Sequence, residues 1–284
     1  MLAAENLRAH WQEAVVAVEH VLEHAKNRGD RWRSDALEFF APAVFWGPTP
    51  LATGLPRLEA IVEDARGDKS LEAWSMRPVA GFYAMQGRFD EARELLAEAT
   101  RILQELGRRL DAVTLAFWTG PLELMAGNPA EAARVTGEAC DFLDAAGERG
   151  WLSTMATIYA SALCEQGLFD EAEAAARRSR DAATSDDYNA QALWRSSLAR
   201  ALAHKGQHQE AERLADEAIP WIDRSDELNT QADTRVEVAE AYWLAGRADK
   251  GVTALQEALE RYEQKGNVVM AERTRALLHE HAYR

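Results

Sequence analysis

The sequence predicts an all-α protein, a right-handed α-solenoid of about seven antiparallel helix pairs. Three observations lead to this fold class. A short glycine-containing motif recurs about every 40 residues along the 284-residue chain. Small and large residues alternate at helical spacing around each copy. No segment shows the two-residue alternation that is typical of a half-buried strand.

The recurring motif is a glycine, two or three variable residues, an acidic residue and then a small residue. Its glycines lie 40, 40, 39 and 40 residues apart and are Gly87, Gly127, Gly167, Gly206 and Gly246. Glycine ends a helix at low cost because it enters left-handed backbone geometry readily. Asp90, Pro129 and Asp170 then suit the first turn of the following helix. Each copy therefore predicts a tight turn between two helices.

The residues around these anchor glycines follow the same register. Small residues stand seven positions upstream: Ala80, Gly120, Ala160, Ala199 and Ala239. Turn-forming residues stand 20 positions downstream: Gly107, Gly147, Asp187, Asp226 and Gly266. Small residues at this spacing let two helices cross closely, and the downstream residues mark a second turn in each unit.

We expect one superhelical domain over residues 1–284. Residues 1–66 contain degenerate repeats, with a helix from about Asp30 to Trp46, a break at Gly47-Pro48-Thr49-Pro50 and a shorter helix over about 56–66. Residues 67–266 contain five regular repeats. Residues 267–284 form a C-terminal capping helix, as is usual at the end of a solenoid.

This pattern resembles the tetratricopeptide repeat, with units about one helical turn longer than the usual 34 residues. Three further motifs are Phe45-Trp46-Gly47-Pro48-Thr49-Pro50, Ala190-Gln191-Ala192-Leu193-Trp194-Arg195 and Tyr262-Glu263-Gln264-Lys265-Gly266-Asn267-Val268-Val269. In combination they are similar to the C-terminal repeat region of bacterial class III adenylate/guanylate cyclases that also carry an AAA-type ATPase domain. The resemblance implies a regulatory segment of a bacterial signalling protein, whose enzymatic activity would reside in other domains.

Composition excludes several classes of partner. The 47 acidic residues outnumber the 32 Lys and Arg, for a net charge of −15, which disfavours nucleic-acid binding. No apolar run approaches the roughly 18 residues that a membrane span needs. Cys140 and Cys164 lack metal-type spacing and are interpreted as buried small hydrophobes in a reducing compartment. The acidic start of the chain lacks a signal peptide, so we expect a cytoplasmic protein.

Motifs for catalysis, cofactors and metals are also missing. Gly67-Asp68-Lys69-Ser70 is the nearest string to a phosphate loop, but it joins two helices instead of following a strand. His20 and His24 have helical metal-ligand spacing but no third ligand. No nucleophile motif such as Gly-x-Ser-x-Gly occurs. We therefore expect no enzyme activity, no cofactor and no metal.

In the resembled family, the first helix of each unit lines a concave groove. By resemblance, groove positions lie 13, 10, 6 and 3 residues before each anchor glycine. Aromatic and arginine side chains are the usual anchors of interfaces. The candidates in this register are Trp74, Arg77, Phe117, Arg200 and Trp243. The alternative for each is that it closes the core instead.

The sequence thus predicts a non-catalytic interaction or regulatory and sensor module. Its partner would be a protein or peptide, including other domains of its own parent protein, with no nucleic acid and no membrane. The two groove arginines would favour a carboxylate-bearing segment. The alternative function is a receptor for a small molecule or peptide held in the concave groove.

Overall fold

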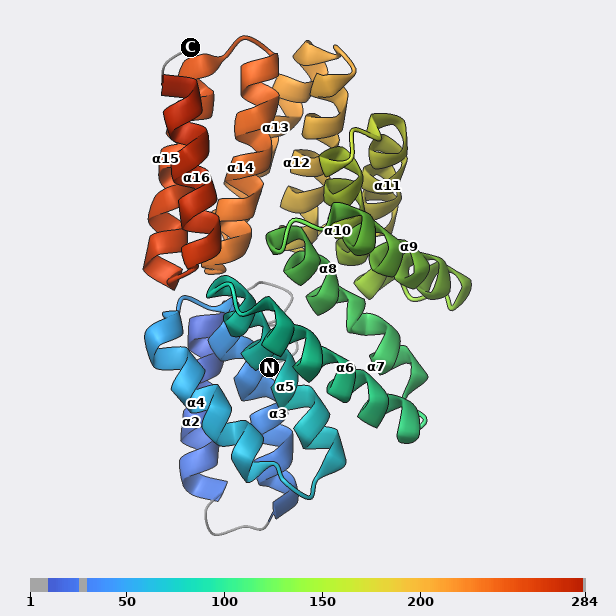
Figure 1. The fold of residues 1–284 in the computed structure, drawn as a ribbon, viewed down its shortest axis with the longest axis vertical. Helices are drawn as coiled ribbons and strands as arrows, with labels where there is room; N and C mark the ends of the chain where they lie inside the picture. The colour runs from blue at the N-terminus through green and yellow to red at the C-terminus, as the bar shows by residue number, and fades with distance from the viewer. Residues whose placement is uncertain (1–9, 26–29, 283–284) are drawn as a thin grey trace.

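The computed structural model describes residues 10–25 and 30–282, and throughout these ranges the chain forms helices joined by turns (Figure 1). The predicted right-handed solenoid of antiparallel helix pairs is confirmed. The helices are α2 (Trp11–Ala25), α3 (Asp30–Trp46), α4 (Leu51–Asp64), α5 (Lys69–Met85), α6 (Phe89–Glu105), α7 (Arg109–Thr114), α8 (Ala116–Met125), α9 (Pro129–Ala145), α10 (Arg149–Glu165), α11 (Phe169–Ala182), α12 (Tyr188–His204), α13 (His208–Ile222), α14 (Leu228–Leu244), α15 (Ala248–Lys265) and α16 (Val268–Ala282).

The turns form as their residues predict. All five anchor glycines have positive φ, for example 79° at Gly87 and 75° at Gly167, so each ends its helix in left-handed geometry. The second turns use side-chain caps as well. Asp68 and Asp187 accept hydrogen bonds from the backbone N–H groups of Leu71 (3.2 Å) and Ala190 (2.9 Å) at the starts of α5 and α12.

Small residues sit where the helices cross. The alanines seven positions before the anchor glycines are fully buried, and so are Ala172 and Ala211 just after them. At Gly120, a Cβ atom would overlap Thr136 of α9 and Ile158 of α10, so the helices approach too closely for a side chain there. The expected burial of Cys140 and Cys164 is also confirmed.

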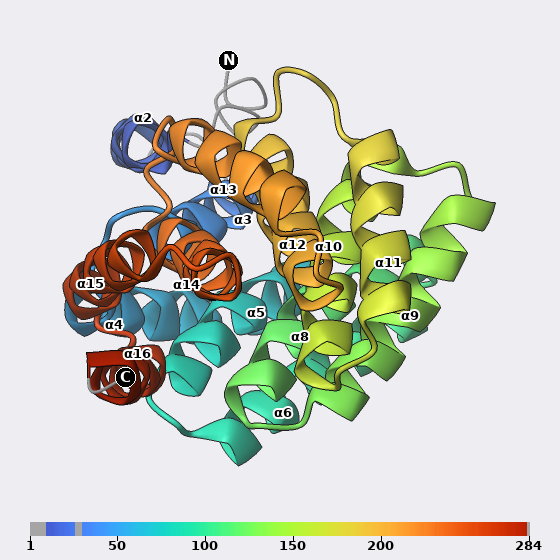
Figure 2. The same ribbon diagram turned by 90° about the horizontal axis from the view of Figure 1, so that it is seen from above.

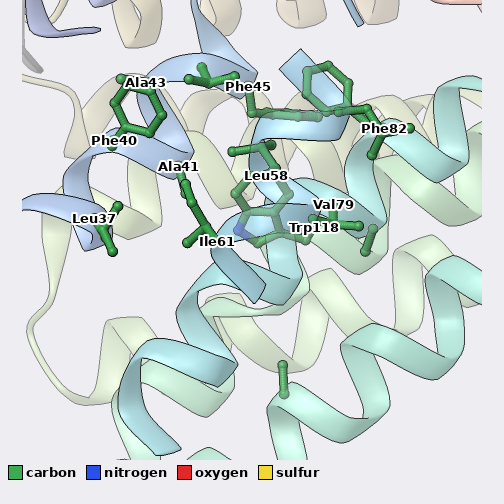
Figure 3. Close-up of a cluster of buried hydrophobic side chains, with 14 of the residues drawn as sticks. Leu37, Phe40, Ala41, Ala43, Phe45, Leu58, Ile61, Val79, Phe82 and Trp118 are labelled. Carbon is green, nitrogen blue, oxygen red and sulfur yellow. The ribbon is translucent and has the colours of Figure 1, made fainter. Parts of the chain in front are cut away.

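The degenerate N-terminal region differs from expectation in one boundary. The helix expected over about 56–66 begins five residues earlier, at Leu51, because Pro50 is extended (φ −63°, ψ 146°) and precedes it directly. Pro56 is accommodated inside this helix. Together α3, α4, α5 and α8 enclose a hydrophobic cluster in which Phe45, Phe82 and Trp118 lie against Leu58 (Figure 3).

The superhelix closes on itself, and α14–α16 (orange to red) lie beside α2–α5 (blue to cyan) in both views (Figures 1 and 2). Lys265, at the end of α15, makes one of the joining contacts. Its fully buried ammonium donates to the backbone carbonyls of Val44 (3.2 Å), Gly47 (2.6 Å) and Thr49 (2.8 Å) at the C-terminal end of α3.

Two further side chains make similar contacts between helices that are distant in the sequence. Arg273 of α16 donates to the carbonyls of Leu124 (3.0 Å) and Met125 (2.8 Å), which end α8. Asp226 accepts from the backbone N–H groups of Trp11 (2.8 Å) and Gln12 (2.7 Å), which begin α2. Each contact matches charge to the helix dipole, with a carboxylate at an N-terminus and cations at C-termini. Closure is therefore a set of helix caps supplied from the far end of the chain.

Candidate functional site

The closed superhelix surrounds a central cavity of about 1480 Å³. Side chains from α3, α5, α8, α10, α12, α14 and α16 line it, so the inner helix layer forms its wall. The structure places all five predicted groove residues on this wall: Trp74, Arg77, Phe117, Arg200 and Trp243. It therefore brings the whole candidate set to one cavity, while their binding of a partner stays a prediction.

One side of the cavity is an aromatic wall made by α3, α5, α8 and α10. Its members are Phe45, Trp46, Trp74, Phe117, Trp118 and Trp151. Apart from Trp74, their rings are in contact, with centroids 4.8 Å apart for Phe45 and Trp118 and 5.1 Å apart for Trp46 and Phe117. Gly81 of α5 allows this arrangement because a Cβ atom there would overlap the ring of Phe45. Such rings offer large apolar contact areas at low entropic cost.

Arg77 emerges from α5 within the aromatic wall and is only 2% exposed. Its guanidinium lies 3.4 Å from the ring centroid of Trp74, and its Nε atom donates to the Trp74 carbonyl at 3.3 Å. Among the described residues, no carboxylate lies within ion-pair distance of it. Burial lowers the pKa of Arg77 to about 9, partly offset by the charges of Asp111 and Glu38. At neutral pH the group remains a buried cation.

A second part of the lining is an acidic wall, which we define as Glu227, Asp233, Glu237 and Glu240 on and just before α14. The Glu237 carboxylate accepts hydrogen bonds from three serines: Ser161, Ser196 (2.5 Å) and Ser197 (3.2 Å). Burial raises the pKa of Glu237, while the nearby Arg200 and these hydroxyl groups oppose that rise. The hydroxyl donors thus satisfy this carboxylate inside the protein.

The other members of the acidic wall are satisfied as well. The buried Glu227 carboxylate accepts from Trp11 Nε1 (2.5 Å) and Thr230 Oγ1 (2.6 Å), and burial raises its pKa to about 7. Asp233 accepts from the Tyr262 hydroxyl. Enclosure by the protein raises the pKa of Asp233 to about 7, although its side chain faces the open interior of the cavity.

Arg200 belongs to this acidic wall by its contacts. Its guanidinium donates to Glu240 (2.6 Å) and Glu165 (2.6 Å), and His204 also contacts Glu240 at 2.5 Å. Burial would lower the pKa of Arg200, but the surrounding carboxylates raise it. The two predicted arginines therefore differ, because Arg200 is held by the protein's own acids and Arg77 is not.

Unpartnered polar atoms gather at this cavity. Within the described ranges, the buried side-chain nitrogens and oxygens without a hydrogen-bond partner are Trp74 Nε1, Trp243 Nε1 and Asn189 Oδ1. All three residues line the cavity. A buried polar atom left unpaired costs about 1–3 kcal/mol.

The predicted register found part of the lining and missed a neighbouring position. Residues nine before the anchor glycine also face the cavity in four units: Trp118, Ile158, Ser197 and Glu237. Trp151 also lines the cavity and lies 16 positions before Gly167, one helical turn before the first predicted position. Helical spacing could have predicted these residues, because positions 16, 13, 9 and 6 before the glycine lie on one face of a helix.

The string that most resembles a phosphate loop acts as a helix cap. The Gly67 N–H donates to Glu72 Oε1 (2.7 Å), and the Asp68 carboxylate caps α5. The protein's own carboxylates thus occupy the groups that would cradle a phosphate. In the described part of the chain, no group of three or more His, Cys, Asp or Glu is placed to hold a metal. In those same ranges, no helix combines the length and apolar character of a membrane span.

Comparison with known proteins agrees with this architecture. The tetratricopeptide repeat family model matches residues 73–115 and 192–220. No curated protein matches the chain in sequence.

Among solved structures, NprR in complex with its cognate peptide NprX is 13% identical, with 98% of this chain and 80% of that chain covered and a TM-score of 0.65. A Rap protein complexed with Competence and Sporulation Factor is 11% identical, with coverage of 94% and 79% and a TM-score of 0.62. The APC/C hetero-tetramer Cut9–Hcn1 is 15% identical, with coverage of 91% and 45% and a TM-score of 0.65. Identities this low show the fold alone, and the fold of this chain is that of a tetratricopeptide-repeat solenoid.

Proposed function

We propose that this chain is a non-catalytic sensor or regulatory module that binds a short peptide segment inside its central cavity. The observation that carries this proposal is the closure of the superhelix around the cavity. An open solenoid presents a concave face to folded partners, whereas this one surrounds its concave face with its own two ends. Even the smallest folded domains, of about 50 residues, are too large for the interior.

An extended peptide suits the cavity better than a compact small molecule does. Its volume of about 1480 Å³ exceeds the roughly 300–1,000 Å³ of ordinary small-ligand pockets. The aromatic wall offers sites for the apolar side chains of a peptide. NprR, which shares the fold, is seen in complex with its cognate peptide, and this supports a peptide as the occupant.

The setting of the module is part of the proposal. The resemblance to cyclase and ATPase regulators favours a cytoplasmic role within a bacterial signalling protein. The peptide would then come from a partner protein or from another domain of the parent. We also propose that the chain acts as one superhelical domain with residues 267–284 as its C-terminal cap. Sequencing the coding region upstream of this chain in the native genome tests the link to a cyclase or ATPase.

Binding inside the cavity is tested with two matched substitutions. Thr154 of α10 lines the cavity, and Thr253 of α15 lies exposed on the outer layer. A library of random hexapeptides is passed over the immobilised protein, and retained peptides are identified by mass spectrometry. We expect retention by the wild-type protein and by Thr253→Trp, and loss of retention in Thr154→Trp because the indole fills the cavity.

Two outcomes would contradict the proposal. Retention that survives Thr154→Trp would place binding on the outer surface. A wild-type protein that retains no peptide, while small organic molecules raise its melting temperature, would favour the small-molecule receptor instead.

A further inference from the structure

We infer that Arg77 and Trp74 form a carboxylate-binding subsite in the cavity, which takes the free C-terminal carboxylate of the bound peptide. That the ligand is a peptide rests on the proposed function. The carboxylate subsite itself rests on the geometry around Arg77.

Among the described residues, no group accepts a hydrogen bond from the two terminal nitrogens of Arg77. Its guanidinium stacks 3.4 Å from the Trp74 ring centroid and lies 6.0 Å from that of Trp118. Stacking occupies the faces of the group and leaves its edge free for partners in its plane. In the described part of the chain, only Nε has a hydrogen-bond acceptor, the Trp74 carbonyl at 3.3 Å. The two terminal nitrogens therefore remain as donors on the wall of the cavity.

Nearby carboxylates do not complete the site. Asp111 accepts from Arg108 Nε at 2.6 Å. Glu38 accepts from the Ser70 hydroxyl at 3.3 Å. Both act on Arg77 only at longer range. Its counter-charge thus has to come from outside the described residues.

Arg235 of α14 shows what the fold does with a buried arginine that is purely structural. It is 1% exposed, close to the 2% of Arg77. Its guanidinium is paired with Asp223 (2.5 Å) and Glu257 (2.7 Å) and also donates to the Gln231 carbonyl (3.2 Å). A buried charge without such partners is strongly unfavourable. Arg77 is the exception because its acceptors are those of a ligand.

The chemistry of the ligand follows from the shape and charge of the site. A guanidinium edge matches a planar carboxylate through two parallel hydrogen bonds. A doubly charged phosphate fits less well, since Glu38 also lines the cavity and the chain carries a net charge of −15. Trp118 beside Arg77 begins the aromatic wall, so the residue that carries the carboxylate should be apolar.

The test uses small probes on the full-length chain labelled with ¹⁵N at tryptophan. The probes are acetyl-Leu-Phe with a free carboxylate, its C-terminal amide, acetyl-Glu-Phe-amide and inorganic phosphate. Binding is followed by the indole Nε1–H signal of Trp74, which is assigned with Trp74→Phe. We expect the free acid to bind about ten- to a hundredfold more tightly than the amide, as a charged hydrogen-bonded pair predicts. Acetyl-Glu-Phe-amide should resemble the amide.

Arg77→Met should abolish the preference for acid over amide. The matched control is Arg195→Met, because Arg195 stacks 4.1 Å from Trp194 but lies outside the cavity lining and is paired with Glu217. If Arg77→Met unfolds, Arg77→Lys is used instead. It keeps the positive charge but lacks the two parallel guanidinium donors, so it should reduce the preference for acid over amide severalfold.

Equal binding of acid and amide, or a preference that survives Arg77→Met, would overturn the subsite and leave peptide binding in the cavity intact. Stronger binding of phosphate, or equally strong binding of acetyl-Glu-Phe-amide, would overturn the assignment to a peptide C-terminus. A clear acid preference in the probes with no hexapeptide retained would uphold the subsite and overturn the proposed function.

Discussion

Two arginines at predicted groove positions, Arg77 on the aromatic wall and Arg200 on the acidic wall, have opposite surroundings. Arg200 is held by Glu165 and Glu240, and Glu237 beside it is held by serines. Arg77 has aromatic faces around it and no counter-ion among the described residues. The difference separates a part of the framework from a part that is prepared for a ligand. Charge alone does not identify a binding residue, because the partners already supplied by the fold decide whether it is available.

The largest expected effect concerns Arg200. Replacing it with methionine leaves Glu240 and the half-buried Glu237 without the nearby cation, so Arg200→Met should lower the free energy of unfolding by about 3–5 kcal/mol. Urea denaturation followed by circular dichroism measures this change. A loss below about 1 kcal/mol would show that the acidic wall does not depend on Arg200 and would remove the contrast with Arg77.

A pH series examines the acidic wall at Glu227, whose pKa burial raises to about 7. The protonated carboxyl stabilises the fold below the unfolded-state pKa near 4.5, and this contribution is lost as the pH rises through 7. The Glu227→Gln variant has no carboxyl group that titrates at this position. Its stability relative to wild type should therefore rise between pH 4 and pH 8, by on the order of 2–3 kcal/mol. Thermal or urea melts across this range measure it, and a flat difference would contradict the raised pKa.

The packing of the aromatic wall is tested at Gly81, where Phe45 occupies the space of a side chain. Gly81→Ala should destabilise the protein by about 1–3 kcal/mol, because overpacking outweighs the better helix propensity of alanine. Gly150→Ala on α10 is the control, since its nearest neighbour is a flexible carboxylate at 3.5 Å. That variant should be neutral or slightly more stable. Equal melting temperatures for both variants would mean that Phe45 moves aside freely.

The smallest expected effect on stability is at Arg77 itself. Arg77→Met exchanges an unpaired buried cation for an apolar side chain of similar length, so the free energy of unfolding should change by less than about 1 kcal/mol or increase. The same urea series that includes Arg200→Met measures it. A loss as large as that of Arg200→Met would mean that Arg77 is structural, and the two walls would then be alike.

The sequence predicts the solenoid well because each unit repeats the same local chemistry. Positive-φ glycines such as Gly87 and buried small residues such as Ala172 are decided within one helix pair. The groove register rests on helical geometry alone, and the residues it names, such as Trp74 and Trp243, line the cavity, while their role in binding stays a prediction. The register did not include Trp118 and Glu237, because it omitted the position nine residues before each anchor glycine.

Two features lay beyond sequence reasoning for a physical reason. Arg77 and Arg200 both fall at predicted groove positions, and only residues from neighbouring helices, such as Glu165 and Glu240, show that Arg200 is already paired. Closure depends on small rotations summed over all the units. The contact of Lys265 with Gly47 spans 218 residues, and no local pattern announces it.

Closure also changes how the array should unfold. An open repeat protein behaves as a one-dimensional chain of nearest-neighbour couplings, so it frays from its ends and can unfold unit by unit. Here Asp226 and Lys265 couple the last units to the first, and Arg273 couples α16 to the end of α8. The chain of couplings becomes a ring, in which neither end can separate without breaking contacts with the other. Unfolding should then be more nearly all-or-none than in an open array of the same length.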